Sequence, residues 1–301
     1  MHYNSEKPIG VIYRHAEHFN PLFTELKKSG LSYEIIDPSN QYFNPLQREL
    51  PFSLVLNDMS NPSYQKNKSG ILIEYLKLIE GLHTGASIIN GSRIGETFTY
   101  QTRQFNIFAS LDMPFPKTIV ASNTEQFLKS IHELKFPILV SYNDCSEKTR
   151  FESEAELVQA IILDQLNFDN RALVIQEYIP SKGNHTVRAE MLNGRFLYAV
   201  KIFCAGDSSE GWSLEAHMEV FTPPLNIITA LEKIAHASLM DVGSISFITD
   251  RRSNTILFQG IQPHTSTYSQ EVKGLTVNMN EHIANYVGHR LRKIREIELS
   301  I

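Results

Sequence analysis

Short apolar and polar blocks alternate along residues 1–95 and predict a parallel α/β domain. Runs rich in β-branched residues have the length of buried strands, at residues 9–13, 33–36, 53–57 and 86–90. Apolar residues at helical spacing stand between them at 19–29 and 71–82, and Gly30 is the predicted end of the first helix. Strands that alternate with helices at such short intervals are typical of a parallel sheet.

The middle segment, residues 96–172, predicts a link helix and a small lid subdomain. Residues 96–112 carry one apolar helical face, which the Pro-x-Pro at 114–116 ends. Beyond it the pattern predicts strands and helices in alternation: strands at 117–121 and 136–140, and helices at 124–134 and 152–163.

Longer strands follow in residues 173–301 and predict an antiparallel sheet. Asn193-Gly194 is a two-residue turn signal between predicted strands at 186–192 and 195–203. The remaining predicted elements are a strand at 173–179, a helix at 226–239, strands at 243–249 and 255–261, and a terminal helix at 281–297. The chain is therefore predicted to be α/β and α+β, with three parts: 1–95, 96–172 and 173–301.

Composition narrows the function mainly by exclusion. The 301 residues are 42% hydrophobic and 20% charged with a net charge of −5, which suits a packed core and lacks a strongly basic nucleic-acid footprint. The only cysteines, Cys145 and Cys204, exclude a disulfide scaffold and a Cys-rich zinc module. The polar start of the chain and the absence of a long apolar run predict a soluble, cytoplasmic protein that does not bind membranes.

Four segments between residues 88 and 263 carry a family resemblance. They are IINGSRIGETFTYQTRQFNIFASLDMPFPKTIVAS (88–122), FPILVS (136–141), LVIQEYIPSKGNHTVRAEMLNGRFLYAV (173–200) and VGSISFITDRRSNTILFQGIQP (242–263). In this order they resemble ATP-grasp enzymes, and most of all the ribosomal-protein-S6 glutamate ligases. These enzymes join a carboxylate to an amine through an acyl-phosphate. The resemblance thus implies a ligase that uses ATP and Mg²⁺ on an amino acid or peptide.

The resemblance implies a nucleotide-binding hinge. Gln176, Glu177, Tyr178 and Ile179 match the strand whose backbone reads the adenine edge. Glu177 would contact the ribose or the adenine; the alternative is an edge-strand carboxylate with no ligand.

Two basic residues are also implied as ligand contacts. Arg188 matches the arginine that stabilises the transferring phosphoryl group, and Lys201 stands where a second basic residue is often found. The alternatives are a strand arginine paired to a nearby carboxylate and a simple surface lysine.

Charged groups that the family uses for phosphate are absent at the matching positions. Gln101 and Ser141 stand in place of two lysines. Residues 142–148 contain no glycine, although a glycine-rich loop normally lets backbone N–H groups approach phosphate. Lys148 is the one candidate for a substitute cation in this stretch.

The magnesium ligands differ from the family pattern as well. The expected aspartate is Ser246, and the expected Glu-x-Asn pair falls on Gly260 and Gln262, or on Gln259 after a one-residue slip. Mg²⁺ prefers carboxylate oxygens, and none remains at these positions, so no metal ligand is predicted and Mg²⁺ binding is doubtful.

Three functions remain open. The first is a divergent ATP-grasp protein with impaired or lost ATP/Mg catalysis that binds a nucleotide, a peptide or a catalytic partner subunit. The second is an active ATP-dependent ligase that forms amide bonds. The third is a repurposed site built on His185, His217 and His264. A homodimer through the terminal helix is also open.

Overall fold

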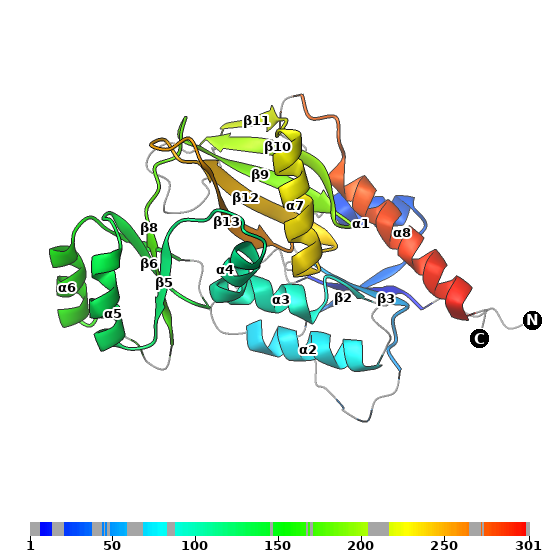
Figure 1. Cartoon of the computed structure of the whole chain (residues 1–301). Helices are drawn as coiled ribbons and strands as arrows, with labels where there is room; N and C mark the ends of the chain where they lie inside the picture. The colour runs from blue at the N-terminus through cyan, green and yellow to red at the C-terminus, as the bar shows by residue number, and fades with distance from the viewer. Residues whose placement is uncertain are drawn as a thin grey trace, which may run out of the picture.

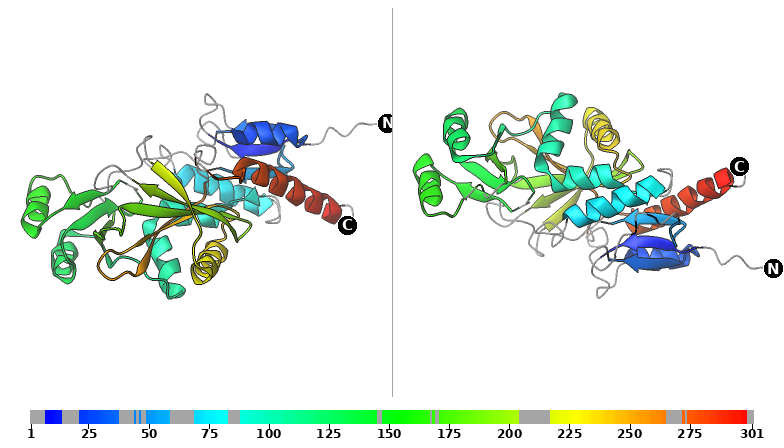
Figure 2. Two further views of the ribbon diagram at one scale, coloured as in Figure 1. Left: turned by 90° about the horizontal axis from the view of Figure 1, so that it is seen from above. Right: turned by 90° about the horizontal axis from the view of Figure 1, so that it is seen from below.

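Three sheets organise the chain (Figure 1). The computed structural model describes residues 7–13, 21–37, 44, 46, 49–58, 69–82, 88–144, 147–166, 168, 171–203, 217–264, 272 and 274–298. Two further views show the lid and the first sheet at opposite ends of the molecule, with the five-stranded sheet between them (Figure 2). Within the described ranges, no helix combines the length and the apolar character that crossing a membrane requires.

The first sheet is parallel, with the order β2-β1-β3-β4, as the alternating pattern predicts. Its elements are β1 (Ile9–Ile12), α1 (Pro21–Lys28), β2 (Tyr33–Ile36), β3 (Leu54–Asn57), α2 (Ser69–Leu82) and β4 (Ile88–Ile89). Gly30, at φ 72°, follows α1 in the left-handed conformation expected of a helix-ending glycine. Helix α2 packs on one face through an apolar cluster that includes Leu72, Leu76 and Ile79.

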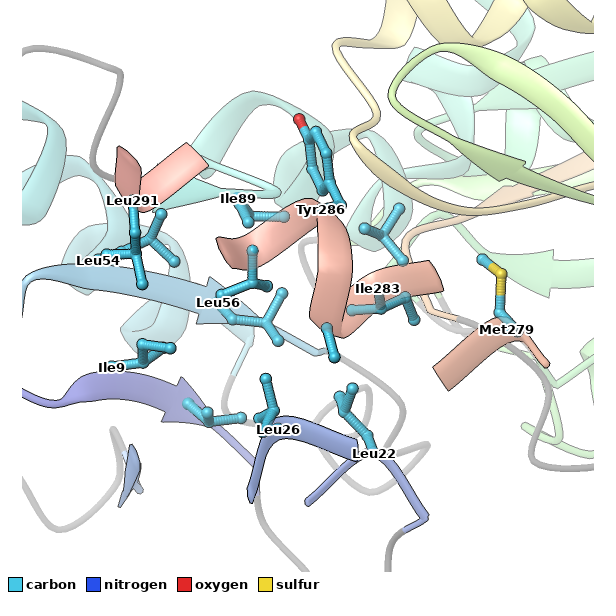
Figure 3. Close-up of a cluster of buried hydrophobic side chains, with 14 of the residues drawn as sticks. Ile9, Leu22, Leu26, Leu54, Leu56, Ile89, Met279, Ile283, Tyr286 and Leu291 are labelled. Atoms are coloured by element: carbon cyan, nitrogen blue, oxygen red, sulfur yellow. The ribbon is translucent and has the colours of Figure 1, made fainter. Parts of the chain in front are cut away.

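The terminal helix α8 (Met279–Glu298) packs on the other face of this sheet, together with α1. Figure 3 shows Ile283 and Leu291 of α8 in one cluster with Leu26 of α1 and Leu56 of β3. The predicted three-part division had placed this helix with the last sheet. Apolar periodicity identifies the buried face of a helix but does not say which sheet it covers.

The lid is a small antiparallel sheet with helices on one side. Its strands, in the order β5-β8-β6-β7, are β5 (Thr118–Ala121), β8 (Leu173–Glu177), β6 (Ile138–Tyr142) and β7 (Thr149–Phe151). The helices are α5 (Thr124–Ser130), the short η4 (Ile131–Glu133) and α6 (Glu154–Ile162). Strand β8 pairs with both β5 and β6, so it belongs to this sheet although the predicted boundary at residue 173 assigned it to the last part.

The five-stranded sheet is antiparallel, with the order β11-β10-β9-β12-β13. Its strands are β9 (His185–Leu192), β10 (Arg195–Phe203), β11 (His217–Phe221), β12 (Val242–Thr249) and β13 (Ile256–Gln262). Asn193 and Gly194 both have positive φ, at 52° and 72°, as the predicted hairpin turn requires.

Helix α7 (Leu225–Ser238) and the link segment pack on one face of this sheet. The predicted link helix is two helices, α3 (Ser92–Thr99) and α4 (Gln101–Ser110), separated by Tyr100 in an extended conformation. The break sets Gln101 at the start of α4, beside the lid.

Candidate functional site

The predicted phosphoryl and metal positions meet on one face of the five-stranded sheet. Arg188 of β9 is paired with Ser246 of β12, which is paired in turn with Gly260 of β13. Residues directly opposite one another on neighbouring strands point to the same face. Gln259 stands at a register shift between Gly260 and Phe258, so it does not take the place of Gly260.

Arg188 forms a buried ion pair on this face. Its Nε donates to Oε1 of Glu190 at 2.9 Å, and the two side chains are 7% and 0% exposed. Its Nη2 donates to the carbonyl oxygen of His264 at 3.0 Å. These contacts match the alternative in which Arg188 is a strand arginine paired to a nearby carboxylate.

Glu190 is a site residue that the sequence analysis missed. It follows Arg188 by two positions on the same strand, and alternation along a strand places both side chains on one face. Its partners in the register are Ser244 and Tyr198. The positions matched to magnesium ligands hold no carboxylate, but the face that they share does.

His264 is half-buried next to this pair. Burial, together with the charge of Arg188, lowers the pKa of its imidazole to about 3, so the ring is neutral. Its edge contacts Phe98 of α3, with ring centroids 5.6 Å apart. Among the described residues, its Nδ1 and the Oγ of Ser246 have no hydrogen-bond partner.

The other two histidines of the third hypothesis lie elsewhere. His185 and His217 flank Phe203 across three strands, with ring centroids 5.1 and 5.5 Å from it. They alternate onto the face opposite to that of Arg188. Of the residues that the structure describes, no three His, Cys, Asp or Glu side chains gather as a metal-binding group.

Lys201 is separated from Arg188 by the thickness of the sheet. In the register of β9 and β10, Arg188 pairs with Val200 and Lys201 pairs with Val187. Lys201 therefore points to the opposite face, where its Nζ lies 4.9 Å from the ring centre of Phe221. The structure does not bring the two predicted basic residues together.

The predicted hinge residues connect the lid to the five-stranded sheet. Oε1 of Glu177 accepts a hydrogen bond from the backbone N–H of Lys135 at 3.0 Å, so this carboxylate anchors a lid loop. The backbone N–H of Tyr178 donates to Pro137, and the guanidinium of Arg150 lies 4.0 Å from the Tyr178 ring centre. Ile179 follows beyond the end of β8 and is half-buried.

Gln101 and Ser141 contact each other. Nε2 of Gln101 donates to Oγ of Ser141 and to the carbonyl oxygen of Tyr142, both at 3.0 Å. The two positions that the resemblance matches to phosphate-binding lysines thus converge, and here they form a neutral hydrogen bond.

Lys148 lies on the lid nearby. Its Nζ donates to Oε1 of Gln176 at 3.1 Å, and desolvation by the surrounding protein lowers its pKa to about 8. Within the glycine-free stretch, Cys145 and Ser146 lie outside the described residues.

A pocket of about 550 Å³ lies apart from these residues, where α3, the β9–β10 turn, α7 and α8 meet. Its polar lining includes Glu80, Arg93, His236, Asp241 and Arg290. Arg290 donates to Asp241 at 3.1 Å and ties α8 to the start of β12. The position of α8 therefore determines where Arg290 lines this pocket.

No family model and no curated protein matches the chain in sequence. Solved structures do match it in shape. PsnB, an ATP-grasp ligase complexed with a minimal precursor, has 11% identity and a TM-score of 0.67 over 95% of this chain and 99% of that one. A RimK domain protein of the ATP-grasp type from Sphaerobacter thermophilus has 14% identity and a TM-score of 0.68 over 93% and 99%. The chain has the ATP-grasp fold.

A third neighbour is the D-alanine–D-alanine ligase from Bacillus anthracis, solved with ATP. It has 14% identity and a TM-score of 0.67 over 97% of this chain and 99% of the ligase. Each of these three matches covers at least 93% of this chain and 99% of the neighbour. At these identities the likeness is one of fold, and the chemistry has to be argued from the residues of this chain.

Proposed function

We propose that this chain is a divergent ATP-grasp protein that has lost magnesium-dependent ligation and acts by binding a nucleotide and a peptide or partner subunit. The observation that carries the proposal is the neutral contact between Gln101 and Ser141. ATP-grasp chemistry needs positive charge at these matched positions to hold the triphosphate, and this pair supplies none.

The state of Arg188 supports the same proposal. Phosphoryl transfer depends on positioning and on charges directed at the transferring group. The guanidinium of Arg188 is instead bonded to Glu190 and to a backbone carbonyl. Losing one preorganised electrostatic group lowers the rate about 10²–10³-fold. Here neutral residues stand at the two lysine positions and Arg188 is held in an ion pair, although the effects of such losses are not additive.

The alternative is an active ATP-dependent ligase that forms amide bonds. Glu190 favours it, because this carboxylate lies on the face where the resemblance places the metal. Arg188 donates to Oε1 of Glu190, so a magnesium ion at this carboxylate would lie close to the positive charge of the guanidinium. PsnB has been solved with Mg and ADP, and also with precursor peptide, which supports a peptide as the partner under either function.

Calorimetric titration of ATP, with Mg²⁺ and with EDTA, separates the two functions when combined with an assay of ADP release. The proposal predicts an affinity that Mg²⁺ leaves unchanged and no ADP release. The alternative predicts binding that requires Mg²⁺ and is lost in Glu190→Gln. Ser244→Ala, on the same face, is the matched control, since its hydroxyl offers no charge to a metal. ADP release that depends on Mg²⁺ and on peptide would overturn the proposal.

A further inference from the structure

Lys148 occupies a defined place on the lid sheet. The register of β6 and β7 pairs Val140 with Thr149, so one further step sets Ser141 opposite Lys148. Alternation puts both side chains on the face that Gln176 shares. Lys148 therefore lies one strand away from Ser141, the position where the resemblance expects a lysine.

A chain of hydrogen bonds orients the partner of Lys148. Nε2 of Gln176 donates to Oγ1 of Thr118 at 2.9 Å, and that hydroxyl donates to the carbonyl oxygen of Pro116 at 2.7 Å. Gln176 is 5% exposed, and its amide is held with the oxygen toward Lys148. The site is thus preorganised across the lid.

The ammonium group of Lys148 has one hydrogen-bond partner among the described residues. It has three donors, and Gln176 receives one of them. No carboxylate pairs with Lys148 among the described residues. Arg150, which alternation places on the same face, adds a second positive charge and is itself paired with Glu152 at 2.7 Å. A partly desolvated ammonium group that is bonded only to a neutral amide is unfavourable, and an incoming anion would relieve that cost.

We propose that Lys148 and Gln176 form an anion site on the lid that binds the phosphate of a nucleotide without a metal ion. The inference rests on the proposed function and names the charge that would hold the ligand. Lysine binds phosphate as a point charge, and Lys148 remains partly exposed and so within reach of a ligand. Gln176 is the first of the four predicted hinge residues, so the site lies on the strand matched to the adenine contact.

The test is calorimetry in EDTA with ADP, adenosine and inorganic phosphate as separate probes. Lys148→Met should weaken ADP binding about 10- to 100-fold, the range expected for losing one charged hydrogen bond, and should leave adenosine binding unchanged. Lys148→Arg should retain part of the affinity. Lys129→Met is the matched control, because Lys129 lies on α5, paired with Glu125 in solvent. Thermal unfolding confirms that each variant is folded.

The probes also identify the source of the anion. Binding of inorganic phosphate to the wild type, competing with ADP and lost in Lys148→Met, supports the site. Equal affinity of the wild type and Lys148→Met for ADP overturns it, as does a wild type that binds no ADP in EDTA. A different result would contradict the proposed function: release of ADP by the wild type that depends on Mg²⁺.

Discussion

Replacing Arg188 with methionine tests whether this arginine is part of the core or is free to serve a ligand. The Arg188 side chain is 7% exposed and that of its partner Glu190 is fully buried, and Nε of Arg188 lies 2.9 Å from Oε1 of Glu190. The substitution keeps most of the aliphatic volume and removes the charge. It leaves a buried carboxylate without its cation, which costs far more than the ion pair itself contributes.

The expected loss is about 3–5 kcal/mol of unfolding free energy, the range for removing one partner of a buried ion pair. A typical domain has about 5–15 kcal/mol in total, so the shift in a urea transition would be large. The double variant Arg188→Met with Glu190→Leu removes both charges and should recover most of that loss. Arg195→Met is the control, since Arg195 is 74% exposed and its pair with Glu232 should contribute less than about 1 kcal/mol.

Urea unfolding followed by fluorescence and by circular dichroism gives the free energies of all four proteins. The reasoning is refuted if Arg188→Met costs less than about 1 kcal/mol, because Glu190 would then not depend on this arginine. A double variant that is as unstable as the single one would show that the cost comes from packing and not from the stranded charge.

Three further predictions follow from single residues. Asn90→Ala should lower the free energy of urea unfolding by about 3 kcal/mol, because the buried Asn90 amide forms hydrogen bonds with the backbone of Asp241 and Val242 and the residue has φ 58°. Asn90→Gly should lower it less, because glycine adopts this φ without strain. Gly194→Val should lower the melting temperature, since its φ is 72° and a Cβ would overlap the ring of His236. ADP affinity in EDTA should fall as pH rises above about 8, because Lys148 then loses its proton, whereas phosphate, with a second pKa of about 6, keeps its charge. The affinity of Lys148→Met should not change over this pH range.

Local patterns were sufficient to predict most elements of the fold. The four apolar runs of the first sheet were predicted as strands of a parallel sheet, and they pair in parallel. Strands β1, β3 and β4 are buried along their whole length, whereas the edge strand β2 is exposed at Glu34 and Ile35. Asn193-Gly194 predicted a hairpin because both positions need positive φ, and they have it. Such signals depend on a few neighbouring residues and so can be read without knowing the rest of the chain.

Long-range assignments needed the structure. The apolar side of α8 is visible as a periodic stripe, but its packing against α1 joins segments about 250 residues apart. Strand β8 is inserted between β5 and β6, which no local pattern indicates. The same limit applies at the site: alternation could have shown that Glu190 accompanies Arg188, whereas the opposite orientation of Lys201 follows only from the register of β9 and β10.

Several positions that the resemblance matches to the site of ATP-grasp enzymes contact one another, although some of them hold neutral residues here. A misplaced alignment would scatter residues that the resemblance assigns to one function. Instead, Gln101 and Ser141, 40 residues apart, share a hydrogen bond, and Arg188 stands beside Ser246 in the register. These two pairs meet in space, whereas Lys201 lies on the face opposite to that of Arg188. Under the proposed function, an anion is then held by Lys148 and not by these neutral positions.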